Sequence, residues 1–199
     1  MSVEKTAYHH GDLREALLLA AEAALMDMPV EEVSLREIAR RAGVSHAAPK
    51  HHFASLGQLF AEVAARGFEH FYDALEDAAN RDADQSPRSR TMAIGRAYLR
   101  FAADNPAIYS LMFGKRDNVI LTTPRLTMAM LAAWGQLEGQ VATLIGDTRA
   151  HYGAVTVWSA VHGLAMLRLE RKLPPHVEPE VALEALLRTL VAGLEAEGG

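Results

Sequence analysis

The sequence predicts an all-α protein, and three observations support this prediction. Apolar residues recur along the whole chain with the period of amphipathic helices. Few stretches alternate with the two-residue period of a strand between turn residues. Hydroxyl residues, prolines and glycines mark helix starts and ends at the borders of the apolar stripes. We therefore expect about nine helices and no internal repeat.

Three helices are expected before residue 54. The first starts near Gly11 and stops before Pro29, and its buried face is expected to carry Leu13, Leu17, Ala21 and Ala24. Ser34 is a candidate N-cap for a short helix that ends at Gly43, and Ser45 can cap the next helix.

The remaining helices follow from the same signals. A long helix is expected over about 56–79, and residues 80–90 then read as a mobile inter-helix loop because their only apolar residue is Ala83. Five further helices are placed, partly by prolines at their first turns, at 94–103, 106–113, 124–145, 147–171 and 179–197.

Composition limits the function classes. The 199 residues are 50% hydrophobic, carry a formal net charge of -5 and include no cysteine. The acidic balance disfavours nucleic-acid affinity spread over the whole surface but leaves room for a local basic patch. Disulfides, thiol catalysis and cysteine-ligated zinc are excluded. No leader-like or membrane-spanning stretch is apparent, so we expect a soluble cytoplasmic protein without membrane partners.

A local basic patch occurs within the stretch REIARRAGVSHAAPKHHF. Ala39 is the small residue at which two helices can cross, and Gly43 supplies the turn four residues later, which is helix-turn-helix spacing. The formal charge from Arg36 to His52 is +3, because four Lys and Arg residues face one Glu. The residues predicted to contact DNA are Ser34, Arg36, Ser45, His46, Ala47, Lys50, His51 and His52.

The stretch also allows two other interpretations. One is an ordinary corner between two helices with a solvated basic face. The other is a metal site at the adjacent histidines of positions 9–10 and 51–52. Consecutive residues point about 100° apart on a helix, and no H-E-x-x-H pattern accompanies them, so no metal or cofactor is expected.

From YHHGDLREALLLAA through VSLREIARRAGVSHAAPKHHFASLGQLF, the chain resembles the DNA-binding domain of the tetracycline-repressor (TetR) family of transcriptional regulators. The residues that carry the resemblance are Ile38, Ala39, Gly43, Val44, Ser45, His52, Phe53 and Leu59. The resemblance implies a three-helix head whose third helix enters the major groove, on a larger all-α body that binds a small effector and dimerises.

Three positions modify this expectation. Lys50 stands where the family usually has a phosphate-contacting tyrosine, and Leu56 stands where a lysine usually opens the fourth helix. The first change keeps a donor with another geometry, and the second loses a cation. Pro49 lies inside the recognition helix and shortens its regular part.

The second half is similar to the C-terminal domain named for its W…HG motif. The similarity covers roughly residues 90–195 and is carried by YLRFAADNPAIYSLMFG and TVWSAVHGLAMLRLE. It implies a ligand pocket without naming the ligand.

A helical wheel of residues 155–169 separates two faces, and Gly153 continues the first. The first face carries small residues that permit close helix approach, which favours packing against a second subunit. A leucine stripe on the last helix suits the same bundle. The predicted dimer interface is Gly153, Thr156, Ala160, Gly163, Leu183, Leu187, Leu190 and Leu194. The alternative is that both stripes pack entirely within one subunit.

The second face of that helix points to a pocket. Trp158 and His162 lie one turn apart, and aromatic and methionine residues of other helices are candidates to face them. The predicted pocket residues are Tyr98, Phe101, Tyr109, Met112, Phe113, Met130, Trp134, Trp158 and His162. Plain core is the alternative. No lysine or arginine lies between Ala150 and Leu167, which favours an uncharged, mostly apolar ligand.

These patterns predict a ligand-responsive transcriptional repressor that binds a palindromic operator as a homodimer. Residues 1–56 would form the helix-turn-helix domain and residues 57–199 the ligand-binding and dimerisation domain, with coupling through the helix that starts near Leu56. A helical interaction adaptor without operator binding is the alternative. A small-molecule enzyme is disfavoured because the acidic residues cluster on helix surfaces and loops, and no phosphate-binding glycine loop occurs.

Overall fold

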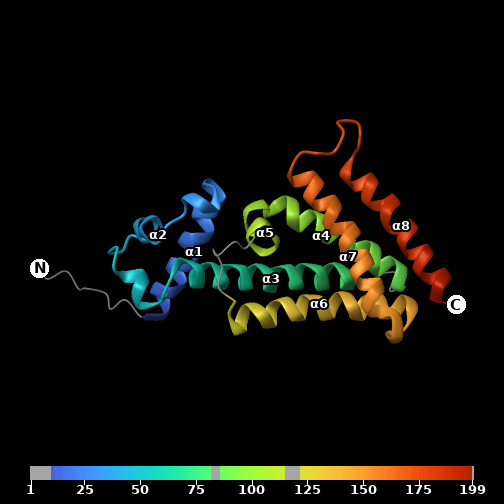
Figure 1. Cartoon of the computed structure of the whole chain (residues 1–199), viewed down its shortest axis with the longest axis horizontal. Helices are drawn as coiled ribbons and strands as arrows, with labels where there is room; N and C mark the ends of the chain where they lie inside the picture. The colour runs from blue at the N-terminus through green and yellow to red at the C-terminus, as the bar shows by residue number, and fades with distance from the viewer. Residues whose placement is uncertain (1–9, 82–85, 115–121, 199) are drawn as a thin grey trace, which may run out of the picture.

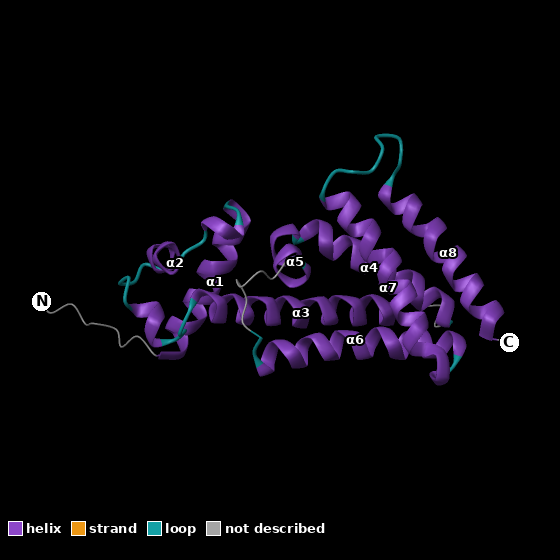
Figure 2. Cartoon of the chain, viewed as in Figure 1, coloured by secondary structure: helices purple, strands orange, loops and turns teal. Residues whose placement is uncertain are grey.

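The structure is a computed structural model that describes residues 10–81, 86–114 and 122–198. This part of the chain contains helices and loops but no strand (Figure 2), so the all-α prediction is confirmed. The elements are α1 (His10–Asp27), η1 (Val30–Glu32), α2 (Leu35–Arg41), η2 (Ala48–His51), α3 (Leu56–Arg81), α4 (Pro87–Asp104), α5 (Pro106–Phe113), α6 (Pro124–Ile145), α7 (Asp147–Leu169) and α8 (Pro179–Gly198).

The long helix α3 is the spine of the molecule. In Figure 1 it extends across the body, with α1 and α2 at its N-terminal end and α6 alongside it. It packs against α1, α4, α5 and α6, while α7 packs against α4, α6 and α8. One continuous apolar core runs through these contacts, from Ile38 in the head to Leu187 in α8. The head and the body therefore share a single rigid element.

The helix-turn-helix geometry follows from a few local interactions. The Ser34 hydroxyl accepts a hydrogen bond from the backbone N–H of Glu37 at 3.2 Å and caps α2. Ala39 is fully buried at the helix crossing, and Gly43 adopts a φ of 69°, which favours glycine. The Val44 N–H then bonds back to the Ala39 carbonyl at 3.0 Å and closes the turn.

The expected third helix is not an α-helix. Residues 48–51 form the 3₁₀ turn η2, whose N-cap residue is Ala47 without a side-chain cap, so the expectation that Ser45 caps this helix is wrong. Pro49 has no N–H to donate, and its buried ring fixes the turn. The Lys50 and His52 N–H groups bond three residues back, to Ala47 and Pro49. For this reason eight α-helices are described instead of about nine.

The loop expected at 80–90 is shorter than predicted. Helix α3 continues to Arg81, and α4 already begins at Pro87. The Ser86 hydroxyl accepts from the Ser89 N–H at 3.2 Å, and Pro87 occupies the first turn, where its missing N–H costs nothing. Residues 87–90 are therefore helical, and positions 82–85 of the expected loop lie outside the described residues.

Candidate functional site

The predicted DNA-contacting residues lie on one end of the molecule. The exposed ones are Ser34, Arg36, Ser45, His46, Ala47, Lys50 and His51, whereas His52 is half-buried. Arg36 and Lys50 form no ion pair with any residue that the structure describes. Their charges are thus available to a phosphate backbone.

The other two arginines of the basic stretch are already paired. Arg40 and Arg41 bind the Glu37 carboxylate at 2.6 and 2.8 Å, and Arg41 also binds Asp27 at 2.6 Å. Hydrogen bonds from Arg40 and Arg41 lower the pKa of Glu37 to about 2. The available positive charge of the head is therefore smaller than the formal count of the sequence indicates.

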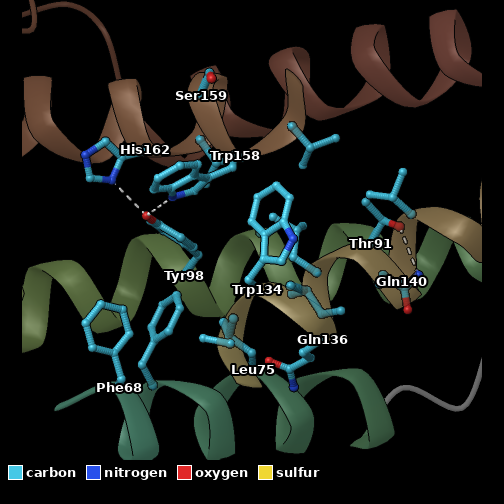
Figure 3. A pocket seen from close by; sticks show the side chains of 18 of the residues that line it. Phe68, Leu75, Thr91, Tyr98, Trp134, Gln136, Gln140, Trp158, Ser159 and His162 are labelled. Atoms are coloured by element: carbon cyan, nitrogen blue, oxygen red, sulfur yellow. Dashed lines mark hydrogen bonds between the residues drawn. The ribbon is translucent and has the colours of Figure 1, made fainter. Parts of the chain in front are cut away.

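A partly open cavity of about 520 Å³ lies in the body. Its walls come from α3, α4, α6 and α7, with contributions from α5 and α8 (Figure 3). Phe68, Phe71 and Leu75 of α3 form one wall. The two tryptophans of the chain, Trp134 and Trp158, both line the cavity, and their ring centroids are 6.2 Å apart. No Lys, Arg, Asp or Glu occurs among the described lining residues.

A cluster of hydroxyl and ring nitrogen groups closes one end of the cavity. His162 Nδ1 lies 2.7 Å from the Tyr109 hydroxyl and 2.9 Å from the Tyr98 hydroxyl, and the two hydroxyl oxygens are 3.0 Å apart. The indole N–H of Trp158 donates to the Tyr98 oxygen at 3.3 Å. The indole N–H and both hydroxyl protons find acceptors within the cluster if Nδ1 accepts, which places the ring proton of neutral His162 on Nε2.

Burial keeps this cluster neutral. It raises the pKa of Tyr98 to about 12 and that of Tyr109 further still. It also lowers the pKa of His162 below its usual value of 6.5. At neutral pH the cavity therefore presents no net charge, and its polar groups act as hydrogen-bonding groups.

The opposite end of the cavity is also polar. There the Gln140 amide N–H₂ donates to the Thr91 hydroxyl oxygen and to the Pro87 carbonyl, both at 3.1 Å. One turn earlier on α6, Gln136 donates to Glu76 at 2.9 Å. In Figure 3 Thr91 and Gln140 lie away from Tyr98 and His162, with Trp134 between them, whereas Gln136 lies below Trp134 near Leu75.

Most of the predicted pocket residues line this cavity. Seven do so, namely Tyr98, Met112, Phe113, Met130, Trp134, Trp158 and His162. Tyr109 is fully buried behind them and bonds to His162, while Phe101 packs against Phe71 with ring centroids 5.1 Å apart. Sequence reasoning missed Gln140, Thr91 and the α3 wall. The α3 residues were recognisable only as a buried stripe, and that stripe does not reveal what it faces.

The predicted dimer residues divide into two groups. Gly153, Leu183 and Leu187, which the sequence assigned to a subunit interface, are instead core residues of one subunit. A Cβ atom on Gly153 would lie 2.7 Å from Ile145 Cδ1, so Gly153 packs closely against α6 of its own subunit. Thr156 is exposed, and the partly exposed residues are Ala160, Gly163, Leu190 and Leu194.

Models of known families match both parts of the chain. The model described as bacterial regulatory proteins, tetR family, matches residues 17–63, and the tetracyclin repressor-like C-terminal domain matches residues 91–190. The second match alone spans half of the chain. The chain belongs to the TetR family. It is accordingly a DNA-binding transcriptional regulator with the helix-turn-helix head described above.

Solved structures of similar proteins agree with this TetR-family architecture. A protein with unknown function from Rhodococcus sp. RHA1 is 32% identical, with a TM-score of 0.83 over 96% of this chain and 100% of the other. FadR from Bacillus subtilis, in complex with stearoyl-CoA, is 11% identical, with a TM-score of 0.70 over 90% of this chain and 98% of FadR. At that identity, FadR shows the shared fold alone.

The match to a further relative spans a smaller part of both chains. Nucleoid occlusion factor SlmA of Idiomarina loihiensis is 29% identical over 136 residues, which span 67% of this TetR-family chain and 66% of SlmA. Over its described residues, the chain has no helix long and apolar enough to cross a membrane. The same residues contain no group of three or more His, Asp or Glu side chains placed to hold a metal ion.

Proposed function

We propose that this TetR-family regulator is a ligand-responsive repressor that binds a palindromic operator as a homodimer and takes a small, mostly apolar effector. One observation carries the proposal: the helix α3 starts at the end of the helix-turn-helix head and also forms a wall of the 520 Å³ cavity. A ligand that fills the cavity therefore contacts the same helix that holds the head. We propose no enzymatic activity.

In this proposal the head comprises residues 1–56 and contacts DNA in two ways. Arg36, Lys50 and His51 are exposed and supply donors for phosphate oxygens. His46 and Ala47 lie on the exposed turn before η2, where a short side chain permits close approach to base edges. Ser34, Ser45 and His52 lie on the same end of the molecule and complete the proposed set of DNA-contacting residues.

Residues 57–199 form the proposed ligand-binding and dimerisation domain. The proposed subunit interface is the outer face of α7 with the adjoining edge of α8. Thr156, Ala160 and Gly163 lie on that face, and exposed Tyr152 and Leu167 extend it. Small residues flanked by apolar side chains suit close helix packing in a two-fold bundle.

The proposed effector is uncharged. FadR from Bacillus subtilis holds stearoyl-CoA, a ligand with several anionic groups. The cavity described above offers no lysine or arginine to such groups, and transfer of an unpaired charge into an apolar cavity is costly. The apolar lining and the neutral Tyr98, Tyr109 and His162 cluster support a neutral ligand instead.

A second connection supports coupling between cavity and head. Glu62 of α3 is 9% exposed and binds two arginines through the same carboxylate oxygen: Arg14 of α1 at 2.6 Å and Arg125 of α6 at 3.0 Å. Arg125 also binds Glu69 at 2.7 Å. Because α6 lines the cavity and α1 belongs to the head, movement of α6 is transmitted to both α3 and α1.

The proposal is tested by selecting duplex sequences that the protein retains and by measuring their affinity across a salt series. A repressor is expected to select a sequence with inverted half-sites and to show strong salt dependence. Absence of salt-dependent duplex binding would favour the adaptor interpretation. Transcription from a promoter that carries the selected site then distinguishes a repressor from an activator.

A further inference from the structure

Helix α6 brings two side-chain amides to the same wall of the cavity. Gln136 and Gln140 lie one helical turn apart, and both line it. Gln140 is only 7% exposed. The orientation of these amides decides whether the cavity offers donors or acceptors to a ligand.

The orientation of the Gln140 amide is set by its partners. Its nitrogen lies 3.1 Å from the Pro87 carbonyl, which only accepts hydrogen bonds. The Thr91 hydroxyl donates to that same carbonyl at 2.8 Å, so the Thr91 oxygen is left to accept from Gln140 at 3.1 Å. A flipped amide would place two oxygens against each other. Gln140 Oε1 accordingly receives no hydrogen bond from the residues that the structure describes.

Gln136 repeats this arrangement. Its nitrogen donates to the Glu76 carboxylate at 2.9 Å and to the Tyr72 carbonyl at 3.3 Å. Hydrogen bonds from Gln136 and then Asn80 lower the pKa of Glu76, so its carboxylate is ionised and only accepts. Gln136 Oε1 is buried and has no hydrogen-bond partner within the described chain. Among the described residues, the Gln136 oxygen is thus fully enclosed without a donor, whereas the Gln140 oxygen lacks a protein donor and remains accessible.

A ligand that displaces water from Gln140 Oε1 has to supply a hydrogen-bond donor, because an acceptor buried without a donor is costly. The Gln140 oxygen repels the lone pairs of a carboxylate or phosphate, and no cation in the described lining offsets that repulsion. A buried ammonium group also lacks compensation, since no carboxylate lines the cavity. The remaining class of head group is a neutral hydroxyl or N–H.

We infer that the cavity selects a neutral, mostly apolar molecule that carries a hydroxyl or N–H donor, and that Gln140 Oε1 accepts this hydrogen bond. The aromatic and aliphatic lining then encloses the apolar part of the ligand. This inference rests on the proposed function, because it names the ligand class of the proposed effector cavity. It separates this protein from regulators whose ligands carry a carboxylate or phosphate head.

The two tryptophans give a direct assay, since both line the cavity and no other tryptophan contributes to the signal. The full-length protein is titrated at neutral pH with decanol, with the near-isosteric methyl nonyl ether, which lacks the donor, and with decanoate. Decanol is expected to bind about tenfold more tightly than the ether. Decanoate is expected to bind more weakly than either.

Variants assign the preference to a residue. Gln140→Met preserves side-chain length and is expected to bring the affinities for decanol and the ether within about twofold of each other. Gln58→Met is the matched control, because Gln58 lies at the start of α3 and bonds to the backbone of Ala54. It is expected to keep the tenfold preference. If Gln140→Met does not fold, the ligand series with the unaltered protein still tests the inference.

Equal affinity for decanol and the ether, tighter binding of decanoate, or no change of tryptophan fluorescence with decanol would each overturn the inference. Equal affinities would still leave the cavity as a ligand site, so the proposed function would survive. Conversely, a clear preference for decanol together with unchanged affinity for the selected operator would support the ligand class and refute ligand-controlled DNA binding.

Discussion

Substitution of Gly163 by leucine separates dimerisation from folding. A Cβ atom on Gly163 would meet no described atom of its own subunit within 4 Å. Within one subunit the added Cβ atom therefore meets no obstacle, and the change removes the helix penalty of glycine, about 0.8 kcal/mol. In a two-fold dimer with α7 at the interface, the same side chain is inserted twice between closely packed helices.

The expected cost to the dimer follows from this duplication. Overpacking costs about 1–3 kcal/mol for each inserted side chain, and so about 2–6 kcal/mol for each dimer. The dimer dissociation constant should rise roughly thirtyfold to more than ten-thousandfold. Sedimentation velocity over a dilution series measures that constant, and circular dichroism checks that the helix content and melting temperature do not fall.

Gly135→Leu serves as the control. Gly135 is exposed on α6 and also has no described atom within 4 Å of a Cβ atom, so the same side chain is added outside the proposed interface. It should leave the dissociation constant unchanged. A dimer that persists in Gly163→Leu would refute the placement of the interface on α7, and a dimer lost only in Gly135→Leu would place it on α6.

Three further changes test the head, the cavity and the link between them. Lys50→Ala should weaken binding to all duplexes alike and reduce the salt slope by about one unit, whereas a change in the selected sequence would contradict a phosphate contact. Because burial lowers the pKa of His162, this imidazole binds a proton more readily in the unfolded chain than in the folded one. The free energy of unfolding should therefore fall as pH decreases below about 6.5. Denaturant unfolding of His162→Asn should lack this part of the pH dependence. Glu62→Gln should lower the free energy of unfolding by about 1–2 kcal/mol, since it weakens the bonds to Arg14 and Arg125. The loss is no larger because these arginines are 41% and 40% exposed, so solvent screens their pairing with Glu62. This substitution should also reduce the effect of ligand on operator affinity, and an unchanged ligand response would remove Glu62 from the coupling.

Local signals determined which elements sequence reasoning placed well. The bounds of α5 agree with the predicted 106–113 because Pro106 can occupy only the first turn, and the helix ends before Gly114. The recognition segment was placed but its conformation was wrong. A proline at the second position of η2 is compatible with both an α-helical first turn and a 3₁₀ turn, so the sequence does not distinguish them.

Long-range packing determined where sequence reasoning failed. Gly153 and Gly163 were assigned to one face because the helical period relates them, yet only Gly153 is covered. Its neighbours, Val141, Ile145 and Leu194, come from α6 and α8 and are not encoded in the α7 pattern. The amide of Gln140 was missed for a similar reason, since its role depends on Thr91, which is distant in sequence.

Because α3 is long, a small tilt of this helix at the cavity produces a larger displacement of the head. Its 26 residues form a rod of about 39 Å, and roughly 22 Å of it separates the cavity residue Phe71 from Leu56 at the head. A tilt of about 5° about Phe71 displaces the head by about 2 Å, and two heads moving apart double that change relative to half-sites spaced by about 34 Å. In the proposed dimer, a ligand that shifts the cavity wall by a fraction of an ångström would thereby misplace the two heads on the operator by roughly the length of a hydrogen bond.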